Sequence, residues 1–309
     1  MKLGLQIPSF TWPGGTAAIG PTFARVVETA DAAGFDSIWV MDHFFQIRGV
    51  GPVEEPMLEG WSALAFAAAH TRRARLGLMV GGIHYRQAGL WAKAATTLDV
   101  LSGGRAYLGI GAAWNEEESR SLGFPMPPLG TRFEMLEETL QIVHAMWQGE
   151  RGTQARFDGR HYVAERLLNS PQALSRPHPP ILIGGGGERK TLRLVAQYAD
   201  ATNVFGGPDQ IRHKYAVLRE HCEAVGRDYR TIERSNLMGL DVRTDGAPGP
   251  SGRGVSPSRA VDLLGALADA GSQHTIVNVP EVWDVARLEL IGRDVLPAIR
   301  ALGEPSPIA

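Results

Sequence analysis

The segment PPILIGGGGERKTLRLVAQYADATNVF, residues 179–205, contains a complete pattern of strand, turn, helix and strand. A short apolar run from Pro180 leads into four glycines, an amphipathic stretch begins near Glu188, and a second apolar run starts at Ala201. Apolar runs that alternate with stretches of helical length are typical of βα units around a parallel sheet. The segment therefore indicates the α/β class.

The same alternation extends along the whole chain and gives eight pairs of strand and helix. The predicted strands are Lys2–Pro8, Ser37–His43, Arg75–Gly82, Ala106–Trp114, Pro180–Gly187, Ala201–Gly206, Glu233–Val242 and His274–Val279. The helices are predicted to begin near Pro21, Glu59, Ala88, Gly130, Glu188, Pro208, Ser256 and Asp284, with both prolines in first turns. Eight such units close most economically as a (β/α)8 TIM barrel in a chain of this length. A doubly wound sheet is the alternative, because periodicity does not reveal strand order.

Two segments interrupt the regular spacing of the predicted barrel domain, which we expect to cover residues 1–309. Between residues 150 and 179, FDGRHYVAE has the pattern of a small hairpin. The segment 244–258, TDGAPGPSGRGVSPS, is rich in Gly, Pro and Ser and predicts a mobile loop. Connections of this length often belong to binding sites, so both are candidates for covering an active site.

Composition restricts the classes of partner and compartment. The chain has 309 residues, 44% hydrophobic residues and a net charge of −2, so no general field attracts nucleic acid or an anionic membrane. No apolar run reaches the length of a membrane span, and the N-terminus lacks the pattern of a secretory signal. The single cysteine, Cys222, excludes an intramolecular disulfide. We therefore expect a cytoplasmic protein with a small-molecule partner.

Asp42 and His43 stand at the end of the apolar stretch FDSIWVM. In a barrel, catalytic groups come from the carboxyl ends of the strands. An imidazole there can act as an acid or base near neutral pH, and an adjacent carboxylate can influence its protonation. The other interpretation is a pair that only hydrogen-bonds the strand terminus. A metal site is not expected, because histidines such as His84 and His274 occur singly, without HxH or HExxH spacing.

The segment IGGGGERKT, residues 183–191, joins a strand to a helix through four glycines. Glycines let backbone N–H groups approach a phosphate, and a helix N-terminus adds favourable partial charge. The segment therefore predicts an anion cradle, although it matches neither the P-loop nor the GxGxxG spacing and could be a flexible turn. In LGIGAAWNEEE, small residues leave space for a planar ring beside Trp114, and Glu116–Glu118 are interpreted as a solvated helix start.

Taken together, these motifs resemble the bacterial luciferase-like flavin and deazaflavin enzymes, most closely their actinobacterial branch of coenzyme F420-dependent oxidoreductases. The resemblance extends over residues 1–243. It rests on LGLQIP, AGFDSIWVMDHF, LGLMVGGIHYR, AKAATTLDVLSGGRAYLGIGAAWNEEE and PPILIGGGGERKTLRLVAQYADATN in this order along the chain.

The resemblance implies a TIM barrel and roles for particular residues. His43 matches the histidine that lies against the redox ring, with Asp42 beside it. A cis peptide bond between Met79 and Val80 is implied as part of a bulge behind the ring. The implied cofactor contacts are Met79, Val80, Gly81, Gly184, Gly185, Gly186, Gly187, Arg189 and Thr191. From their charge alone, Arg189, Lys190 and the loop with Arg253 could receive a polyanionic cofactor tail or could face solvent. The substrate pocket is expected around Phe10, Trp12, Ile47, His84 and Trp114.

There are also departures from the branch that oxidises sugar phosphates or alcohols. That branch carries a tryptophan four positions after the histidine and a glutamate at the end of the fourth strand. Ile47 and Trp114 stand at these positions here. The resemblance therefore does not extend to a substrate.

Three functions remain open from the sequence. The first is hydride transfer between F420 and a small organic substrate. The second is a monooxygenase that uses reduced FMN, molecular oxygen and a separate cofactor reductase. The third is a non-redox barrel that binds a phosphate ligand. Apolar helix faces such as WSALAFAAAH, residues 61–70, also predict a possible homodimer.

Overall fold

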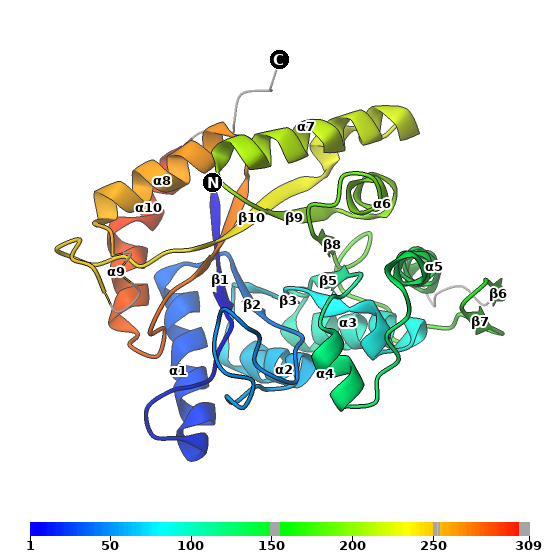
Figure 1. The fold of residues 1–309 in the computed structure, drawn as a ribbon, viewed down its shortest axis with the longest axis horizontal. Helices are drawn as coiled ribbons and strands as arrows, with labels where there is room; N and C mark the ends of the chain where they lie inside the picture. Colours follow the sequence, from blue (N-terminus) through cyan, green and yellow to red (C-terminus); the bar gives the residue numbers. More distant parts are fainter. Residues whose placement is uncertain (149–154, 250–251, 253, 303–309) are drawn as a thin grey trace.

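Parallel strands form the centre of the molecule and helices surround them (Figure 1). The computed structural model describes residues 1–148, 155–249, 252 and 254–302. The strands of the central sheet are β1 (Lys2–Ile7), β2 (Ser37–Val40), β3 (Arg75–Leu78), β4 (Gly81–Gly82), β5 (Leu108–Gly111), β8 (Ile181–Gly184), β9 (Ala201–Phe205), β10 (Glu233–Gly239) and β11 (His274–Asn278). Their order is β3-β2-β1-β11-β10-β9-β8-β5-β4.

This sheet closes on itself. Its ladders are all parallel, and a bridge from Leu76 to Ala106 joins β3 to the segment before β5. The predicted third strand, Arg75–Gly82, is divided into β3 and β4 at the cis peptide bond between Met79 and Val80. The TIM barrel predicted from the alternation is confirmed, and the doubly wound alternative is wrong.

The helices follow the strands nearly as the sequence predicts. They are α1 (Thr16–Ala33), α2 (Gly60–His70), α3 (Ala88–Ser102), α4 (Glu116–Ser121), α5 (Leu129–Trp147), α6 (Thr191–Tyr198), α7 (Pro208–Val225), α8 (Pro257–Asp269), α9 (Ala286–Asp294) and α10 (Leu296–Ala301), with 3-10 turns η1 (Ile83–Tyr85) and η2 (Tyr229–Thr231).

Two predicted helix starts are wrong. Pro208 is the first residue of α7, as predicted, but α1 begins at Thr16 and Pro21 lies inside it. Proline has no backbone N–H to donate, but α1 tolerates this loss inside the helix. Pro21 therefore does not mark the start of the helix. The helix expected from Glu188 begins at Thr191, because residues 188–190 form a turn.

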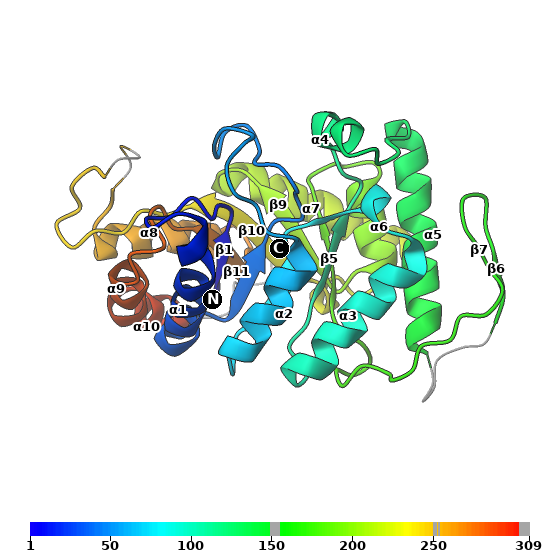
Figure 2. The ribbon, with the colours of Figure 1, turned by 90° about the horizontal axis from the view of Figure 1, so that it is seen from below.

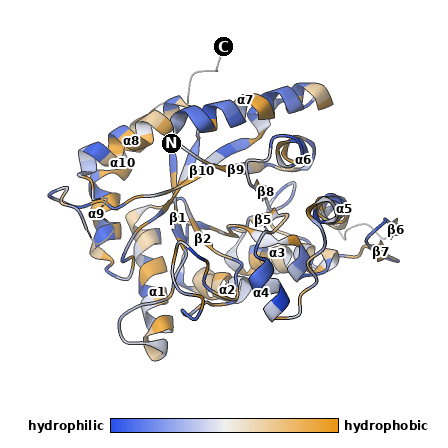
Figure 3. Ribbon diagram, in the orientation of Figure 1, coloured by the Kyte–Doolittle hydropathy of each residue, from blue (hydrophilic) through white to orange (hydrophobic). Residues whose placement is uncertain are grey.

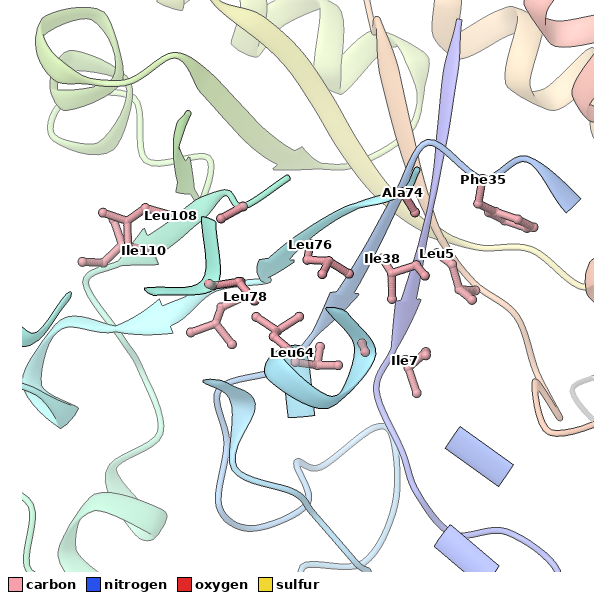
Figure 4. Packing of buried hydrophobic residues seen from close by; sticks show 14 of the residues in the cluster. Leu5, Ile7, Phe35, Ile38, Leu64, Ala74, Leu76, Leu78, Leu108 and Ile110 are labelled. Atoms are coloured by element: carbon pink, nitrogen blue, oxygen red, sulfur yellow. The ribbon is translucent and has the colours of Figure 1, made fainter. Parts of the chain in front are cut away.

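Buried apolar side chains occupy both faces of the barrel wall. Leu5, Ile38 and Leu76 point outward into the large cluster shared with the helices, where Leu64 of α2 packs among them (Figure 4). Trp39, next to Ile38, belongs to a separate cluster of residues from several strands. Neighbours on a strand face opposite sides, so this second cluster fills the interior of the barrel. The helices outside the barrel carry many of the hydrophilic residues, as α4 and α7 show (Figure 3).

A buried polar network closes the amino-terminal end of the barrel. Nε2 of His274 lies 2.9 Å from the Ser37 hydroxyl, and its Nδ1 lies 3.1 Å from Glu233 Oε1. Trp39 Nε1 donates to the same hydroxyl over 2.6 Å. His274 is therefore a structural residue at the end opposite to His43.

The two interrupting segments lie on opposite sides of the barrel (Figure 2). The hairpin prediction is confirmed, because β6 (Phe157–Asp158) and β7 (Val163–Ala164) pair antiparallel. Among the described residues of 155–179 and 244–258, none lines the cavity at the carboxyl ends of the strands. The two segments that the sequence suggested as covers of the active site therefore contribute none of their described residues to the cavity wall. No helix within the described ranges is long and apolar enough to cross a membrane.

Candidate active site

A cavity of about 520 Å³ opens at the carboxyl ends of the strands. Its walls come from the segments that follow β2, β5 and β8 and from the ends of β9 and β11, together with the bulge between β3 and β4 and the start of α5. The loop after β2 and helix α4 rise at this same end of the molecule (Figure 2). Catalytic groups of TIM barrels come from these positions.

A second, more open depression of about 660 Å³ lies at the other end of the barrel. Its wall includes Lys2 and Glu233, which form an ion pair with each other, and Tyr107, which donates to Glu233 over 3.2 Å. Lys2, Tyr107 and Glu233 thus bind one another across the strands at this end. The cavity at the carboxyl ends is therefore the candidate active site.

His43 faces this cavity from the segment just after β2. Its side chain is 12% exposed, and its ring meets that of Trp114 edge-on with centroids 5.5 Å apart. The Nδ1 atom lies 3.1 Å from Oε1 of Glu118. One ring nitrogen is thus engaged within the protein, which leaves Nε2 for other partners.

Glu118 is a site residue that the sequence analysis missed. It was interpreted as part of a solvated helix start, and Glu116 and Glu117 are indeed exposed, but Glu118 is fully buried. Its Oε2 accepts the backbone N–H groups of Phe44 at 2.7 Å and Phe45 at 2.8 Å. Its Oε1 accepts the Tyr85 hydroxyl as well as the His43 ring. Its position on the third residue of α4 turns it inward, which a run of three acidic residues does not reveal.

These hydrogen bonds keep the Glu118 carboxyl ionised. Burial alone would raise its pKa, but the donors from His43, Phe45 and Tyr85 outweigh burial and lower the pKa below its usual value. An ionised carboxylate can only accept hydrogen bonds. The proton of neutral His43 therefore resides on Nδ1, and Nε2 is the acceptor.

Asp42 also lies at the cavity, but its carboxylate binds Arg86 and the backbone of Gly82 and not His43. Arg86 binds its two carboxylate oxygens over 2.7 and 2.8 Å, and the Gly82 N–H donates to it over 3.2 Å. Arg86 also reaches Glu59 over 2.6 Å. Burial alone would lower the pKa of Arg86, but the two carboxylates raise it, so the guanidinium stays charged. This network fastens the end of β2 to the segment that follows the bulge.

The bulge and the glycine segment come together at the cavity. The Met79–Val80 peptide bond is cis, as the resemblance implies, and Met79, Val80 and Gly81 all line the cavity. A Cβ on Gly184 would lie 2.8 Å from Cγ1 of Val80, and one on Gly111 would lie 3.0 Å from its Cγ2. Only glycine fits beside the Val80 side chain at these positions, so Gly111 and Gly184 let the strand ends pack closely against the bulge.

The predicted anion cradle is partly at the cavity. Gly184, Gly185, Gly187 and Thr191 line it, and Gly185 has a φ of +119°, which favours glycine. Gly186 and Arg189 do not line it, and Arg189 is exposed. The third proposed tail contact, Arg253, lies outside the described residues.

Amide side chains on three strands add a polar floor to the cavity. Asn203 on β9, Asn278 on β11 and Gln6 on β1 line the cavity. The Oδ1 atoms of Asn203 and Asn278 are buried and have no hydrogen-bond partner in the described part of the chain. Buried polar atoms normally have partners, so these two oxygens are available to a ligand that carries N–H groups. A polar residue inside an apolar strand end is the signal that could have identified them.

The expected substrate pocket is corrected for three of its five residues. Ile47 and Trp114 line the cavity. Phe10 and Trp12 do not, because they pack with each other at 5.3 Å between ring centroids within the hydrophobic core. His84 is buried against the Ser119 hydroxyl at 2.7 Å, since η1 turns its side chain toward α4.

A closed parallel barrel with its ionisable groups gathered at the carboxyl ends of the strands has the organisation of TIM-barrel enzymes. Residues 1–237 match the model of the family described as luciferase-like monooxygenase. The chain belongs to this family, and the resemblance inferred from its motifs is confirmed.

Individual relatives extend the comparison. The chain is 30% identical over 320 residues to an F420-dependent glucose-6-phosphate dehydrogenase from Beutenbergia cavernae, a match that covers 88% of this chain and 91% of that protein. An F420-dependent secondary alcohol dehydrogenase, solved in complex with an F420-acetone adduct, superimposes with a TM-score of 0.81 at 17% identity over 97% of this chain and 99% of that one. A riboflavin lyase solved with modified FMN gives a TM-score of 0.81 at 14% identity, over 99% and 92% of the two chains. The two solved structures show the shared fold.

Proposed function

We propose that this protein is an F420-dependent oxidoreductase that transfers a hydride between the deazaflavin and a small organic substrate, with His43 as the proton donor or acceptor. The observation that carries the proposal is the His43–Glu118 pair at the cavity. The dehydrogenase relative at 30% identity supports the cofactor, because its name states F420 dependence and the match covers 88% of this chain.

The residues present fit a deazaflavin. Val80, Gly111 and Gly184 pack closely together and line the cavity, and a flat ring system could rest on the surface that they form. The unpartnered amide oxygens of Asn203 and Asn278 can accept ring N–H groups, which a deazaflavin carries on its pyrimidine portion. The glycine segment and the Thr191 hydroxyl can hold the phosphate at the N-terminus of α6.

When bound, F420 supplies or accepts the hydride, and the protein contributes orientation, electrostatics and proton movement. In substrate reduction, protonated His43 donates a proton from Nε2 to the substrate atom that gains negative charge. In substrate oxidation, the neutral ring accepts a proton at the same nitrogen. Glu118 holds the ring in place through Nδ1 and so directs Nε2 toward the cavity.

Asp42 has a positioning role in this proposal. Its carboxylate holds the Gly82 N–H at 3.2 Å and is fixed by Arg86. It therefore sets the distance between the His43 segment and the bulge on which a cofactor ring would rest. Charged groups held this firmly preserve the geometry of a site during turnover.

A monooxygenase that uses reduced FMN is the second candidate. The family description and the FMN-containing riboflavin lyase favour it, and the same cavity would hold the flavin. This function requires molecular oxygen and a separate reductase.

Parallel titration of the apoprotein with F420 and with FMN, followed by fluorescence quenching, tests the proposal. We expect saturable binding of F420 and weaker binding of FMN. A His43→Ala variant is expected to bind F420 as the native protein does and to lose turnover with any acceptor found in a screen. Tight FMN binding without F420 binding would sink the proposal in favour of the monooxygenase, and binding of inorganic phosphate without either cofactor would favour the non-redox barrel.

A further inference from the structure

Large apolar side chains are exposed around the mouth of the cavity. Val50, Trp114, Leu129 and Phe205 all line it, with exposed fractions of 40%, 59%, 53% and 59%. They come from the segments after β2 and β5, from the start of α5 and from the end of β9, so they surround the opening. Apolar side chains that gather at one exposed place mark a surface that binds an apolar partner.

The same wall carries little charge. Among the described residues that line the cavity there is no lysine or arginine, and His43 is its only base. Asp42, the one carboxylate in the lining, is neutralised by Arg86. A substrate anion would therefore meet no fixed cation apart from protonated His43.

Two cations on flanking segments are already engaged. Arg48, which follows Ile47, pairs with Glu117 at 3.3 Å. Lys190 places its ammonium group over the ring of Phe133, 5.4 Å from the centroid. Neither lines the cavity. Lys190 lies just before α6, and its contact with Phe133 holds its ammonium group outside the cavity lining.

We propose that the substrate is an uncharged, largely apolar carbonyl compound, and not a phosphorylated sugar or a carboxylate. That this compound is reduced depends on the proposed function. That the protein prefers an uncharged compound depends only on the residues that line the cavity. Burying a phosphate or carboxylate without a cation costs far more than an apolar wall returns. An apolar body, by contrast, gains from contact with Trp114, Leu129 and Phe205 in proportion to the area removed from water.

The reduction balances with the groups named. A bound reduced deazaflavin would supply the hydride that forms the new C–H bond at the carbonyl carbon as the C=O π bond breaks. The π electrons then move to the carbonyl oxygen. A proton from Nε2 of His43 completes the alcohol, and solvent returns a proton to the imidazole. The deazaflavin leaves oxidised by two electrons.

A pair of probes with the same reacting group tests the binding preference directly. The probes are 4-phenyl-3-buten-2-one and its para-carboxylate, titrated calorimetrically at neutral pH into apoprotein and into F420-loaded protein. We expect the dissociation constant of the uncharged ketone to be at least about tenfold lower than that of the carboxylate. Equal or tighter binding of the carboxylate, or tight binding of glucose 6-phosphate, overturns the assignment.

Phe205→Arg provides a matched perturbation. Phe205 is 59% exposed, so an arginine can be accommodated, and it should shift the preference toward the carboxylate by about tenfold or more. Leu101→Arg is the control, because Leu101 is 67% exposed on α3 and does not line the cavity. An unchanged preference in Phe205→Arg, equal to that of the control, also overturns the proposal.

Failure of this proposal and failure of the proposed function give different results. Binding of F420 with a preference for charged probes removes the substrate class and leaves the oxidoreductase. A preference for the uncharged probe without F420 binding removes the oxidoreductase and leaves the substrate class.

Discussion

Replacing Glu118 with glutamine is expected to reverse the tautomer of His43. The glutamine oxygen is expected to take the place of Oε2, where the N–H groups of Phe44 and Phe45 converge. The amide NH2 then faces His43 Nδ1 and the Tyr85 hydroxyl in place of Oε1. Nδ1 must become an acceptor, so the proton of the neutral ring moves to Nε2 and the cavity loses its proton acceptor.

The magnitude follows from the hydrogen bonds that change. Four bonds to a fully buried carboxylate become neutral, and each charge-assisted bond is worth about 1.5–3 kcal/mol against about 0.5–1.5 kcal/mol for a neutral one. These differences amount to about 5 kcal/mol, and the lower cost of burying an amide in place of a carboxylate offsets part of this loss, so we expect the free energy of unfolding to fall by about 2–4 kcal/mol in total. At roughly 2 °C per kcal/mol for a chain of this size, Tm should fall by about 4–8 °C. Loss of proton transfer should lower kcat by about 10²–10⁴-fold, with F420 affinity nearly unchanged.

Three measurements check this prediction. Calorimetry gives the change in Tm, and the visible absorbance of the deazaflavin gives kcat with an acceptor found in the screen. The ¹⁵N shifts of labelled His43 report its tautomer without any cofactor. Glu117→Gln is the control, because that exposed neighbour pairs only with Arg48 among the described residues. A Glu118→Gln protein with native kcat, native pH profile and Nδ1 still protonated would refute the reasoning.

Three further changes probe the support of the site. Gly184→Ala should weaken F420 binding by about tenfold or more and lower stability by about 1–3 kcal/mol, because the added Cβ would lie 2.8 Å from Cγ1 of Val80; titration and thermal melts measure both. Arg86→Ala should lower the free energy of unfolding by about 3–5 kcal/mol in denaturant titrations, because it leaves Asp42 buried without its cation. Burial lowers the pKa of His84 to about 4. Between about pH 6.5 and 4 the unfolded chain therefore binds a proton that the folded chain does not, so the free energy of unfolding should fall as the pH decreases through this range. His84→Gln should make this pH dependence weaker when unfolding is measured at several pH values.

Matched controls separate these effects from general damage. Gly207→Ala adds a Cβ in open space at a φ of −74°, so it should leave F420 binding intact. Arg48→Ala removes a guanidinium that is 85% exposed and should change stability by less than about 1 kcal/mol. A Gly184→Ala protein as competent as Gly207→Ala, or an Arg86→Ala protein as stable as Arg48→Ala, contradicts the corresponding contact. A pH slope in His84→Gln as steep as in the native protein removes His84 as its source.

The alternation of apolar runs and amphipathic stretches was sufficient to predict the barrel. Eight βα units buried on both faces have few ways to close, and the motifs around His43 and Gly184 lie where strands end. Local details were less predictable. Pro21 was placed at a helix start because proline is favoured there, but the packing of α1 tolerates it inside the helix.

The positions of His43 and the glycine segment at one cavity followed from the sequence, because parallel strands of a barrel present their carboxyl ends at the same opening. Which side chains meet there was decided by tertiary structure. Glu118 lies 75 positions from His43, and the orientation of a six-residue helix brings its carboxylate to the Nδ1 atom of the ring. Asp42, adjacent to His43 in sequence, is turned to Arg86 instead. Burial and long-range hydrogen bonds determine these pairings, and neither is encoded in the spacing of residues along the chain.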